Sequence, residues 1–459
     1  MKPLAGHPVL TAAAMRQAEA AAMIGDVTVD TLMNRAGEAV AEAVRRLAAG
    51  REALILCGPG NNGGDGYVAA AALQRAGVPV RVAAAGDPRS ETAQRARTRW
   101  IGPVEQLADA APAAVLVDAL FGTGLARAMD ASFAEPLRRL TGAAQLAIAV
   151  DLPSGIATDS GETLGDVPRF HLTLALGAAK PAHLLQPGAR FCGTVRVLDI
   201  GVPANSDLTV LDRPHLAAPG PDSHKFSRGM VAIASGSMAG AALLASEAAM
   251  RAGAGYVALL GPVQPGEPHA LVRKALDEHA LADPRIGALL VGPGLGRDDR
   301  ARATLDMVLA TDHPLVIDGD ALHLVTPERL GARGGPIILT PHAGEFDALF
   351  GKGQGSKIDR ARAAATAAGA TVVFKGADTV IAAPNGQVRI AGDANDWLST
   401  AGTGDVLAGA VAAMLAAKLP PLQAASAGVW LHAEAARRLG RAFIADDLAA
   451  MLTPARASL

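Results

Sequence analysis

The sequence predicts an α/β protein of two consecutive units, each built on a largely parallel sheet covered by helices. Three observations lead to this prediction. Short apolar runs of strand length alternate with segments of helical periodicity along the whole chain. A length of 459 residues is typical of two or three domains. Half of the residues are hydrophobic but only 3% are aromatic, so we expect aliphatic cores.

The composition argues against several functional classes. A formal net charge of −2 offers no basic surface for nucleic acid. No apolar run reaches membrane-spanning length, and the first residues lack the apolar core of a signal peptide, so we expect a cytoplasmic protein without a membrane partner. Cys57 and Cys192 lie far apart in apolar contexts, as expected of free thiols in a reducing compartment. The histidines show no paired ligand spacing, so we expect no zinc site.

The first unit opens with two predicted helices between residues 11 and 49 and a strand at residues 53–57. The stretch G-P-G-N-N-G-G-D-G follows from Gly58, and we expect it to be a loop before a helix that starts at Tyr67. A strand, a Gly-rich turn and a helix in this order form an anion site at the helix N-terminus. The polar side chains among these glycines, Asn61, Asn62 and Asp65, indicate a ligand or cation site, and an elaborate turn is the alternative.

The same alternation continues through the first unit. Further strands are expected at residues 78–84, 115–117, 146–150, 172–176 and 195–199, and a helix near residues 90–100. Asp118 ends one strand, and Asp151 ends another shortly before Ser154. Ligands of such sheets bind outside the carboxyl ends of the strands, so these groups should meet the Gly-rich stretch at one rim. Each Asp alone could instead cap a helix.

Prolines cluster between residues 201 and 228, where few apolar residues occur, which indicates a linker. We therefore predict a first domain of residues 1–214 and a second domain of residues 215–459.

The second unit again places polar or glycine clusters after its strands. Its strands are expected at residues 231–234, 256–260, 288–291, 315–317, 337–339 and 371–374, with a helix at 243–252. The clusters that follow them are S-G-S-M-A-G-A from Ser235, G-P-G-L-G from Gly292, D-G-D from Asp318, T-P-H-A-G-E-F from Thr340 and K-G from Lys375. These clusters should share one edge of the sheet.

The stretch S-T-A-G-T-G-D-V-L-A-G, residues 399–409, leads into an apolar, Ala-rich helix. Gly402 and Gly404 let backbone N–H groups approach a ligand, and the helix N-terminus favours an anion. Asp405 would be repelled by a bound phosphate, so its presence suggests a base that removes a proton from an attacking hydroxyl. A core helix whose Asp satisfies first-turn amides is the alternative.

These motifs resemble those of the bifunctional NAD(P)H-hydrate repair enzymes over nearly the whole chain. The first half is similar to the NAD(P)H-hydrate epimerase domain in M-R-Q-A-E (15–19), L-M-N-R-A-G (32–37), G-P-G-N-N-G-G-D-G (58–66), D-A-L-F-G-T-G-L (118–125), D-L-P-S-G (151–155) and D-I-G-V-P (199–203). The second half is similar to the ADP-dependent NAD(P)H-hydrate dehydratase in H-K-F-S-R-G (224–229), G-A-G (253–255), G-P-G-L-G (292–296), L-T-P-H-A-G-E-F (339–346) and A-G-T-G-D-V-L-A-G (401–409). The resemblance implies a Rossmann-like three-layer α/β/α domain followed by a ribokinase-like α/β domain.

The resemblance also implies roles for individual residues. In the first site Asp151 would be catalytic, a potassium ion would be held by Asn62, Asp118 and Ser154, and the hydrated nucleotide would contact Asn61, Asn62, Gly63, Gly64, Asp65, Gly122, Thr123, Gly124, Leu125, Ala126, Arg127 and Ala128. In the second site Asp405 would be the catalytic base and the hydrate would face Ala241, Gly294 and His342. ADP, with or without Mg²⁺, would be held by Lys375, Gly376, Ala377, Asp378, Thr379, Asn395, Ser399, Thr400, Ala401, Gly402, Thr403 and Gly404.

The implied chemistry suits these residue types. Hydration leaves a hydroxyl on the carbon beside the ring nitrogen, and phosphorylation of that hydroxyl from ADP would turn it into a better leaving group. Asp405 would act as the base, and the amides of residues 402–404 would stabilise charge on the transferred phosphate. We further expect a homo-oligomer whose small-molecule partners are the hydrates of NADH and NADPH together with ADP.

Two alternatives stay open at this point. The second half alone is also compatible with a ribokinase-like small-molecule kinase, because such kinases share the Gly-rich anion site and the Asp base. The first half could be a non-catalytic nucleotide-binding module. The polar residues expected at the strand ends of the first half argue against both alternatives. A kinase does not need a second site of this kind, and a module without catalytic function would be free to lose these residues.

Overall fold

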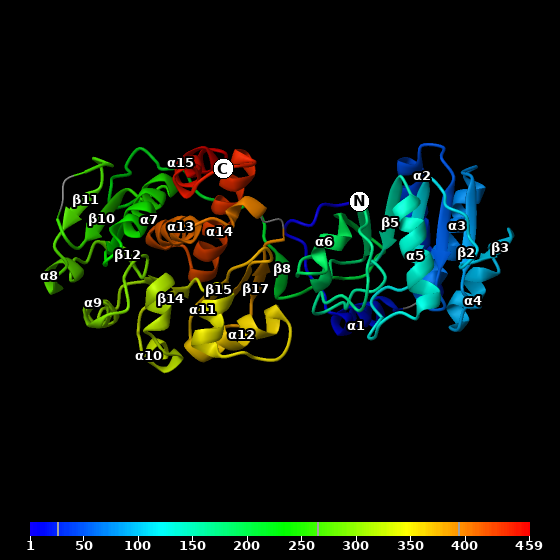
Figure 1. Ribbon diagram of the computed structural model, residues 1–459, viewed down its shortest axis with the longest axis horizontal. Helices are drawn as coiled ribbons and strands as arrows, with labels where there is room; N and C mark the ends of the chain where they lie inside the picture. Colours follow the sequence, from blue (N-terminus) through cyan, green and yellow to red (C-terminus); the bar gives the residue numbers. More distant parts are fainter. Residues whose placement is uncertain (25–26, 264–265, 393–394) are drawn as a thin grey trace. The chain divides into compact units, whose positions relative to one another are not determined.

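The computed structural model describes residues 1–24, 27–263, 266–392 and 395–459. The chain forms two compact units, Met1–Val210 and Leu211–Leu459 (Figure 1). The division lies within the Pro-rich segment, a few residues before the predicted boundary at residue 215. That segment also contains a short strand, β8 (Leu208–Val210), which its prolines did not indicate. Among the described residues, no helix combines the length and the apolar character needed to cross a bilayer.

The first unit contains an all-parallel sheet in the order β3-β2-β1-β4-β5-β6-β7. Its strands are β1 (Ala53–Cys57), β2 (Val80–Ala84), β3 (Val104–Gln106), β4 (Val115–Ala119), β5 (Leu146–Val150), β6 (Leu172–Leu176) and β7 (Thr194–Leu198). Its helices are α1 (Ala12–Ala22), α2 (Val29–Ala48), α3 (Asn61–Arg75), α4 (Glu91–Arg97), α5 (Ala131–Ala143), the 3-10 helix η1 (Pro181–His183) and α6 (Ala189–Cys192). Every predicted strand is confirmed, whereas β3, α5, η1 and α6 were not predicted.

Helices cover both faces of this sheet. Successive residues of a strand point to opposite faces. The first, third and fifth residues of β1 pack in one core cluster with residues of α2 and α3. The second and fourth, Leu54 and Leu56, pack in another cluster with residues of α5. The predicted three-layer α/β/α arrangement of the first unit is therefore confirmed.

The Gly-rich stretch after β1 is not the loop that we predicted, because α3 already begins at Asn61 rather than at Tyr67. Glycine is a poor helix former, which favoured the loop interpretation. Close packing overrides this preference. A Cβ atom on Gly63 would lie 1.9 Å from the carbonyl oxygen of Gly58. The glycines thus let the first turn of α3 approach the end of β1.

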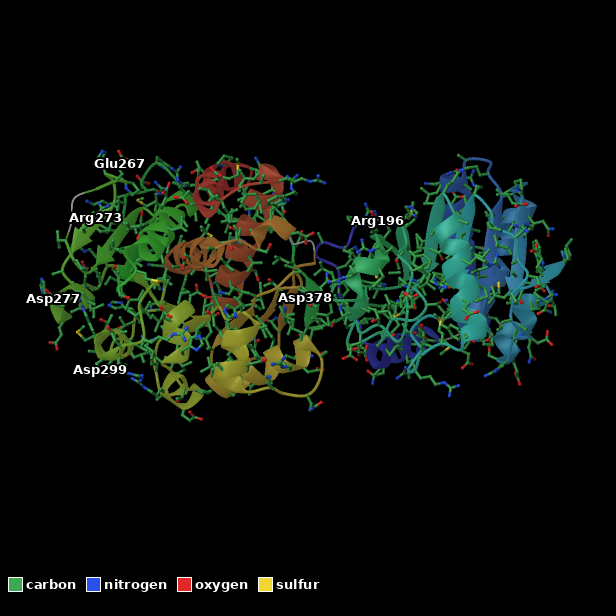
Figure 2. All side chains as sticks on the ribbon, in the orientation of Figure 1. Arg196, Glu267, Arg273, Asp277, Asp299 and Asp378 are labelled. Atoms are coloured by element: carbon green, nitrogen blue, oxygen red, sulfur yellow. The ribbon has the colours of Figure 1, made fainter. Side chains whose placement is uncertain are left out.

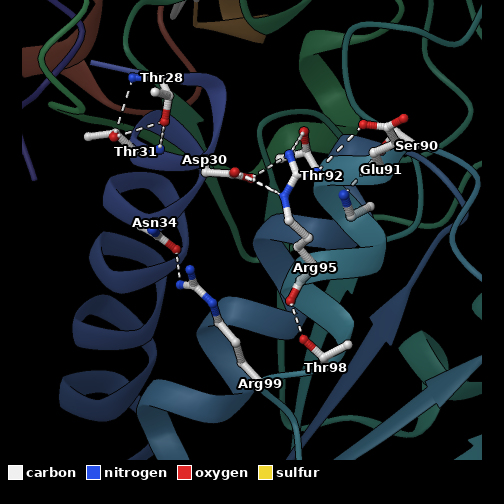
Figure 3. A network of polar contacts seen from close by, with 11 residues as sticks. Thr28, Asp30, Thr31, Asn34, Ser90, Glu91, Thr92, Arg95, Thr98 and Arg99 are labelled. Atoms are coloured by element: carbon white, nitrogen blue, oxygen red, sulfur yellow. Dashed lines mark hydrogen bonds and ion pairs between the residues drawn. The ribbon is translucent and has the colours of Figure 1, made fainter. Parts of the chain in front are cut away.

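Polar contacts join α4 to α2 on the surface of the first unit (Figure 3). Arg95 pairs with Asp30 at 3.0 Å, and Arg99 donates to the side-chain oxygen of Asn34. Such exposed pairs contribute about 0–1 kcal/mol each. The N-cap of α4, Ser90, also contacts the start of α3.

The second unit is also α/β, with the strand order β11-β10-β9-β12-β13-β14-β15-β16-β17. Its strands are β9 (Met230–Ala234), β10 (Tyr256–Leu260), β11 (Val272–Lys274), β12 (Ile286–Val291), β13 (Leu315–Ile317), β14 (Ile337–Leu339), β15 (Thr371–Phe374), β16 (Val380–Ala382) and β17 (Val388–Ile390). Its helices are α7 (Ala239–Ala252), α8 (Glu278–Leu281), α9 (Asp299–Leu309), η2 (Gly319–His323), α10 (Pro327–Gly331), α11 (Ala343–Phe350), α12 (Lys357–Ala368), η3 (Asp396–Leu398), α13 (Thr403–Ala416), α14 (Pro421–Leu439) and α15 (Ala445–Ala457). The strands from β9 to β15 pair in parallel, and β16 and β17 continue antiparallel.

Helix α13 lies at the centre of the second core. From Val406 to Ala416 every residue of this helix is buried, in a cluster that includes residues of α7, α14 and α15. Polar side chains cap helices nearer the surface. Asp277 accepts a hydrogen bond from the amide of Ala280 at the start of α8, and Asp299 is exposed in the first turn of α9 (Figure 2).

We predict that the two units function separately. Each has its own core clusters. A fragment that ends near residue 210 should fold and carry the chemistry of the first site, and one that starts near residue 211 should carry that of the second. Circular dichroism and activity of both fragments would check this. Insolubility of both fragments would show that the units depend on each other.

Candidate active sites

The first candidate site lies where the strand order of the first sheet reverses. Strand β1 has β2 on one side and β4 on the other, and doubly wound sheets bind ligands outside the carboxyl ends at such a point. Asn62 follows β1, Asp118 lies near the end of β4, and Asp151 follows β5. The topology therefore brings the predicted strand-end residues to one edge.

Asn62, Gly122 and Asp151 converge at this edge. A Cβ atom on Gly122 would lie 3.1 Å from Oδ1 of Asn62 and 3.2 Å from Oδ2 of Asp151. Nδ2 of Asn62 is buried and has no hydrogen-bond partner among the described residues. An unpaired buried amide is costly, so this nitrogen is suited to an acceptor that a ligand or water supplies.

Asp118 and Ser154 form a buried pair beside them. Ser154 donates to Oδ1 of Asp118 through its hydroxyl at 2.8 Å and to Oδ2 through its amide at 2.9 Å. The Ser154 hydroxyl also lies 3.2 Å from the carbonyl oxygen of Phe121. Burial raises the pKa of Asp118 to about 6, although these hydrogen bonds oppose the shift. Within the described part of the chain no cationic side chain pairs with this carboxyl.

The other residues predicted for the first site lie around this centre or farther along the loop. Asn61 is exposed and accepts from the hydroxyl of Ser90 at 2.7 Å. The carbonyl of Thr123 accepts from the Thr158 hydroxyl at 3.2 Å. Four loop residues are exposed to solvent: Gly124, Ala126, Arg127 and Ala128. The structure thus brings Gly122 next to Asp151 and leaves the end of the loop in solvent.

Lys180 is a central residue that the sequence did not reveal. Its side chain is 1% exposed and pairs with Oδ1 of Asp151. Lys180 therefore supplies the positive charge that balances Asp151. The only signal in the sequence was a lysine a few residues after the β6 strand.

The second candidate site lies at the N-terminus of α13. Gly402 is the N-cap with a φ of 88°, a left-handed conformation that favours glycine, and Asp405 lies in the first turn. The carbonyl of Thr403 accepts from Nε2 of the buried His432 at 2.9 Å. The predicted helix N-terminus with its carboxylate is therefore confirmed.

A buried ion pair flanks this helix end. Nζ of Lys375 donates to Oδ1 of Asp318 at 2.7 Å and lies 3.8 Å from Oε2 of Glu345. The Thr340 hydroxyl donates to the same Asp318 oxygen at 2.7 Å. A Cβ atom on Gly404 would lie 3.4 Å from Nζ of Lys375. The lysine thus reaches the N-terminus of α13 from the end of β15.

The surroundings of Asp405 suit a base that works near neutrality. Burial, reinforced by Asp318, raises the pKa of Asp405 to about 7, and Lys375 opposes the shift. The ideal pKa of a general base lies near the operating pH. This side chain therefore has the protonation behaviour that proton abstraction requires.

Ala241 and Gly294 meet where the second sheet also reverses its strand order, between β9 and β12. A Cβ atom on Gly294 would lie 3.0 Å from Cβ of Ala241 and 2.2 Å from the carbonyl oxygen of Met238. These two small residues thus bring the first turn of α7 and the loop after β12 into contact.

His342 caps α11. Its Nδ1 accepts from the amides of Gly344 at 3.0 Å and Glu345 at 3.2 Å, and its side chain is 60% exposed. This is the structural role that a lone histidine at a helix start commonly has. The exposed ring leaves Nε2 near Oε1 of Glu345 at 3.4 Å.

The segments predicted to bind the nucleotide are held by local hydrogen bonds. Asp378 (Figure 2) accepts from Nζ of Lys357 at 2.6 Å, and the Thr379 hydroxyl donates to the carbonyl of Gly376 at 2.8 Å. Asn395 donates to the carbonyl oxygen of Gly440 at 2.6 Å, just beyond the end of α14.

The other predicted segment residues continue toward α13. The Ser399 hydroxyl donates to the carbonyl of Asp396 at 2.6 Å, and the Thr403 hydroxyl donates to the carbonyl of Thr400 at 3.0 Å. Beside this segment lies a cavity of about 460 Å³, lined by Asn395, Asp396, Trp397, Gly440 and Arg441.

Comparisons with known proteins cover both units. A family model described as YjeF-related protein N-terminus matches residues 29–182, and one described as NAD(P)H-hydrate dehydratase matches residues 231–455. A solved structure of an ADP/ATP-dependent NAD(P)H-hydrate dehydratase from Bacillus subtilis, co-crystallised with ATP and Mg²⁺, is 30% identical, covering 53% of this chain and 94% of that chain with a TM-score of 0.47.

Two curated relatives extend over nearly the whole chain. The bifunctional NAD(P)H-hydrate repair enzyme Nnr of Thermofilum pendens is 36% identical, covering 90% of this chain and 88% of that protein. The Nnr of Salinibacter ruber is 35% identical, covering 97% of this chain and 95% of that protein. These alignments include both units, so the resemblance predicted from the motifs is confirmed, and the chain belongs to the family of bifunctional NAD(P)H-hydrate repair enzymes.

Proposed function

We propose that this protein repairs hydrated nicotinamide cofactors in two reactions. The first site interconverts the R and S forms of hydrated NADH and NADPH. The second site dehydrates the S form back to NADH or NADPH and converts ADP to AMP and phosphate. The observation that carries the proposal is Asp405, a carboxyl with a pKa near 7 at a Gly-capped helix N-terminus.

In the second site the hydrate hydroxyl would attack the terminal phosphate of ADP. Asp405 would take the hydroxyl proton, and the first-turn amides of α13 would stabilise charge on the phosphate during transfer. Lys375 lies beside the same helix end and would offset the negative charge of the nucleotide. The phosphate would then leave with help from the lone pair of the ring nitrogen.

We propose that Ala241, Gly294 and His342 face the hydrate, and that the segments at residues 375–379 and 395–404 hold ADP with or without Mg²⁺. Ala241 and Gly294 lie at the reversal of the sheet, where ligands of such sheets bind. His342 follows Pro341, whose carbonyl accepts from the amide of Lys375 at 2.8 Å. The cavity beside Trp397 is lined by Asn395 and Asp396 of the second segment.

In the first site Asp151 would act at the carbon that carries the hydroxyl, and the loop from Gly122 would cover the nucleotide. The donor set also fits a potassium ion held by Asn62, Asp118 and Ser154. These residues offer oxygen atoms from an amide, a carboxylate and a hydroxyl, which do not suit zinc. The buried Asp118 carboxyl also has no cationic partner in the described ranges of the chain. Such an ion would supply the countercharge that keeps Asp118 ionised.

The proposal is tested by incubating the protein with NADH hydrate and ADP and following the return of NADH absorbance. Both the R and the S forms should be consumed, because the first site feeds the second. Consumption of the S form alone at an enzyme-dependent rate would remove the epimerase half of the proposal. A requirement for a different phosphate acceptor would instead favour a kinase.

We predict that epimerisation depends on potassium. Asp118→Asn removes the charge that would attract the ion, so it should slow R-to-S conversion and abolish its response to potassium. Conversion is followed by proton NMR of the R hydrate in potassium buffer and in a buffer with a bulky organic cation. Dehydration of the S hydrate is the internal control and should not change. Equal epimerisation rates in the two buffers would exclude the ion from this site.

We also predict the pH dependence of dehydration. Burial raises the pKa of Asp405 from 3.8 to about 7, so the carboxyl becomes protonated as the pH falls through neutrality. A protonated base cannot accept a proton, so kcat/KM for the S hydrate should fall about tenfold for each pH unit below about 7. An acidic limb that instead appeared near pH 4, the range of an ordinary carboxyl, would contradict the role of this residue.

We further propose that the protein acts in the cytoplasm as a homo-oligomer.

A further inference from the structure

Asp151 is held in a strained conformation by the segment that follows β6. Its φ is 66°, a left-handed value that is rare for a residue with a side chain. Oδ1 accepts from the amide of Leu176 at 3.1 Å and from Nζ of Lys180. The main-chain carbonyl of Asp151 lies 2.7 Å from Nε2 of His183. Oδ1 is therefore fully engaged, whereas Oδ2 faces Gly122.

His183 fixes the arrangement of this segment as a neutral side chain. Its Nδ1 accepts from the amide of Lys180 at 2.9 Å, so the ring proton resides on Nε2 and is donated to Asp151. Burial lowers the pKa of His183 to about 4. Lys180 therefore carries the only positive charge of this segment that contacts Asp151 within the described residues.

Asp65 is a second buried carboxyl, and unlike Asp151 it has no cationic partner in direct contact among the described residues. It is 8% exposed and lies one helical turn beyond Asn62 on α3, where no hydrogen bond or ion pair from the described residues reaches its carboxyl. The charged groups that face it are Asp151, Glu19 on α1 and Lys180. Burial, together with Asp151 and Glu19, raises the pKa of Asp65 well above its usual value, against the smaller effect of Lys180.

Two neighbouring carboxyls in different surroundings can take different roles in proton transfer. Asp151 has a direct cationic partner and an amide donor on one oxygen. Asp65 has neither. We propose that Asp65 is the proton donor and Asp151 the proton acceptor of the epimerisation, and that Lys180 is the positioning residue that fixes this division. The inference rests on the epimerase activity proposed above.

The step balances as follows. The Asp65 carboxyl gives its proton to the hydroxyl oxygen of the hydrate, the carbon–oxygen bond breaks, and water leaves. The lone pair of the ring nitrogen forms a carbon–nitrogen double bond. Water then adds to the opposite face of that carbon, and Asp151 takes its surplus proton. One proton has moved from Asp65 to Asp151, and exchange with solvent restores both groups.

The first test replaces Asp65 by asparagine in the full-length chain. An amide cannot donate an acidic proton, so kcat/KM for R-to-S conversion should fall about 10²–10⁴-fold, the usual contribution of a general acid. A protonated carboxyl and an amide are both uncharged and similar in size, so Asp65→Asn should keep the thermal stability of the wild type. Asp109→Asn, the same change at an exposed position of the same unit, is the matched control.

The second test uses the alkaline limb of the pH profile of kcat/KM, which reports ionisation of Asp65. Glu19 raises the pKa of Asp65 and Lys180 lowers it. Glu19→Gln should therefore move the limb to lower pH, whereas Lys180→Met should move it to higher pH and also reduce the rate. Lys2→Met, which removes an exposed Lys–Asp pair, should leave the limb in place. If Lys180 only stabilised the fold, Lys180→Met and Glu19→Gln would not move the alkaline limb in opposite directions.

The outcomes separate this inference from the function on which it rests. A wild-type protein that does not interconvert the hydrates would overturn the proposed epimerase itself. A wild-type protein that interconverts them, with Asp65→Asn as fast as Asp109→Asn, would overturn the role of Asp65. An alkaline limb that stays in place in Glu19→Gln would also overturn the role of Asp65. This variant provides the test if Lys180→Met reduces the fraction of folded protein.

Discussion

Replacing Asp405 by asparagine is expected to reduce ADP-dependent dehydration of the S hydrate about 10²–10⁴-fold, the usual loss when a general base is removed. The amide keeps the size of the side chain but cannot accept the hydroxyl proton. Its raised pKa shows that the folded protein disfavours the ionised carboxyl of Asp405, so the variant should be at least as stable as the wild type above neutral pH. The measurement is the return of NADH absorbance from purified S hydrate and ADP.

The matched control is Asp299→Asn. Asp299 also lies in the first turn of a helix of the second unit, but its side chain is fully exposed. It should keep the wild-type dehydration rate, and both variants should epimerise normally. If Asp405→Asn kept nearly the full dehydration rate, Asp405 would only cap α13, and the base would be unidentified.

Asp151→Asn is expected to have the second large effect, a loss of about 10²–10⁴-fold in R-to-S conversion. The change also leaves Lys180 as an uncompensated buried charge. Breaking a buried pair in this way typically costs about 3–5 kcal/mol, so the first unit should unfold at a lower temperature. Conversion is followed by chromatography of the R hydrate at a temperature where circular dichroism shows the variant to be folded.

Asp166→Asn provides the comparison for Asp151→Asn. Asp166 pairs with Arg138 at 3.8 Å on the surface, where both side chains are mostly exposed. Loss of this pair should change stability by about 0–1 kcal/mol and leave both reactions unchanged. If folded Asp151→Asn converted the R hydrate at the wild-type rate, Asp151 would serve only to compensate Lys180.

The positions of most strands along the chain, and the residues at their ends, could be predicted from the chain itself. Buried parallel strands read as continuous apolar runs, and each is followed by a turn whose polar residues are visible in the sequence. Asp118, Asp151 and Asp405 were therefore recognisable as members of two strand-end sites. Their identification depended on local pattern, which the structure preserves because the carboxyl ends of parallel strands share one edge.

The start of α3 could not be predicted in the same way. Its glycines indicate a loop by intrinsic preference, and their helical conformation depends on how closely Gly63 approaches the backbone of Gly58. This contact forms only when α3 packs against the end of β1. Propensity describes a residue with its neighbours in the chain, so it gave the wrong start for this helix.

Sequence alone determined the α/β class, the two units and the carboxylates proposed for both sites, because periodicity and turn chemistry are local properties. Tertiary structure alone decided the surroundings of those carboxylates. Lys180 pairs with Asp151 from the segment after β6, and Asp65 is buried without a partner among the described residues. Burial raises the pKa of Asp405 to about 7. Burial and charge pairing depend on groups that are distant in the chain, so no local pattern records them.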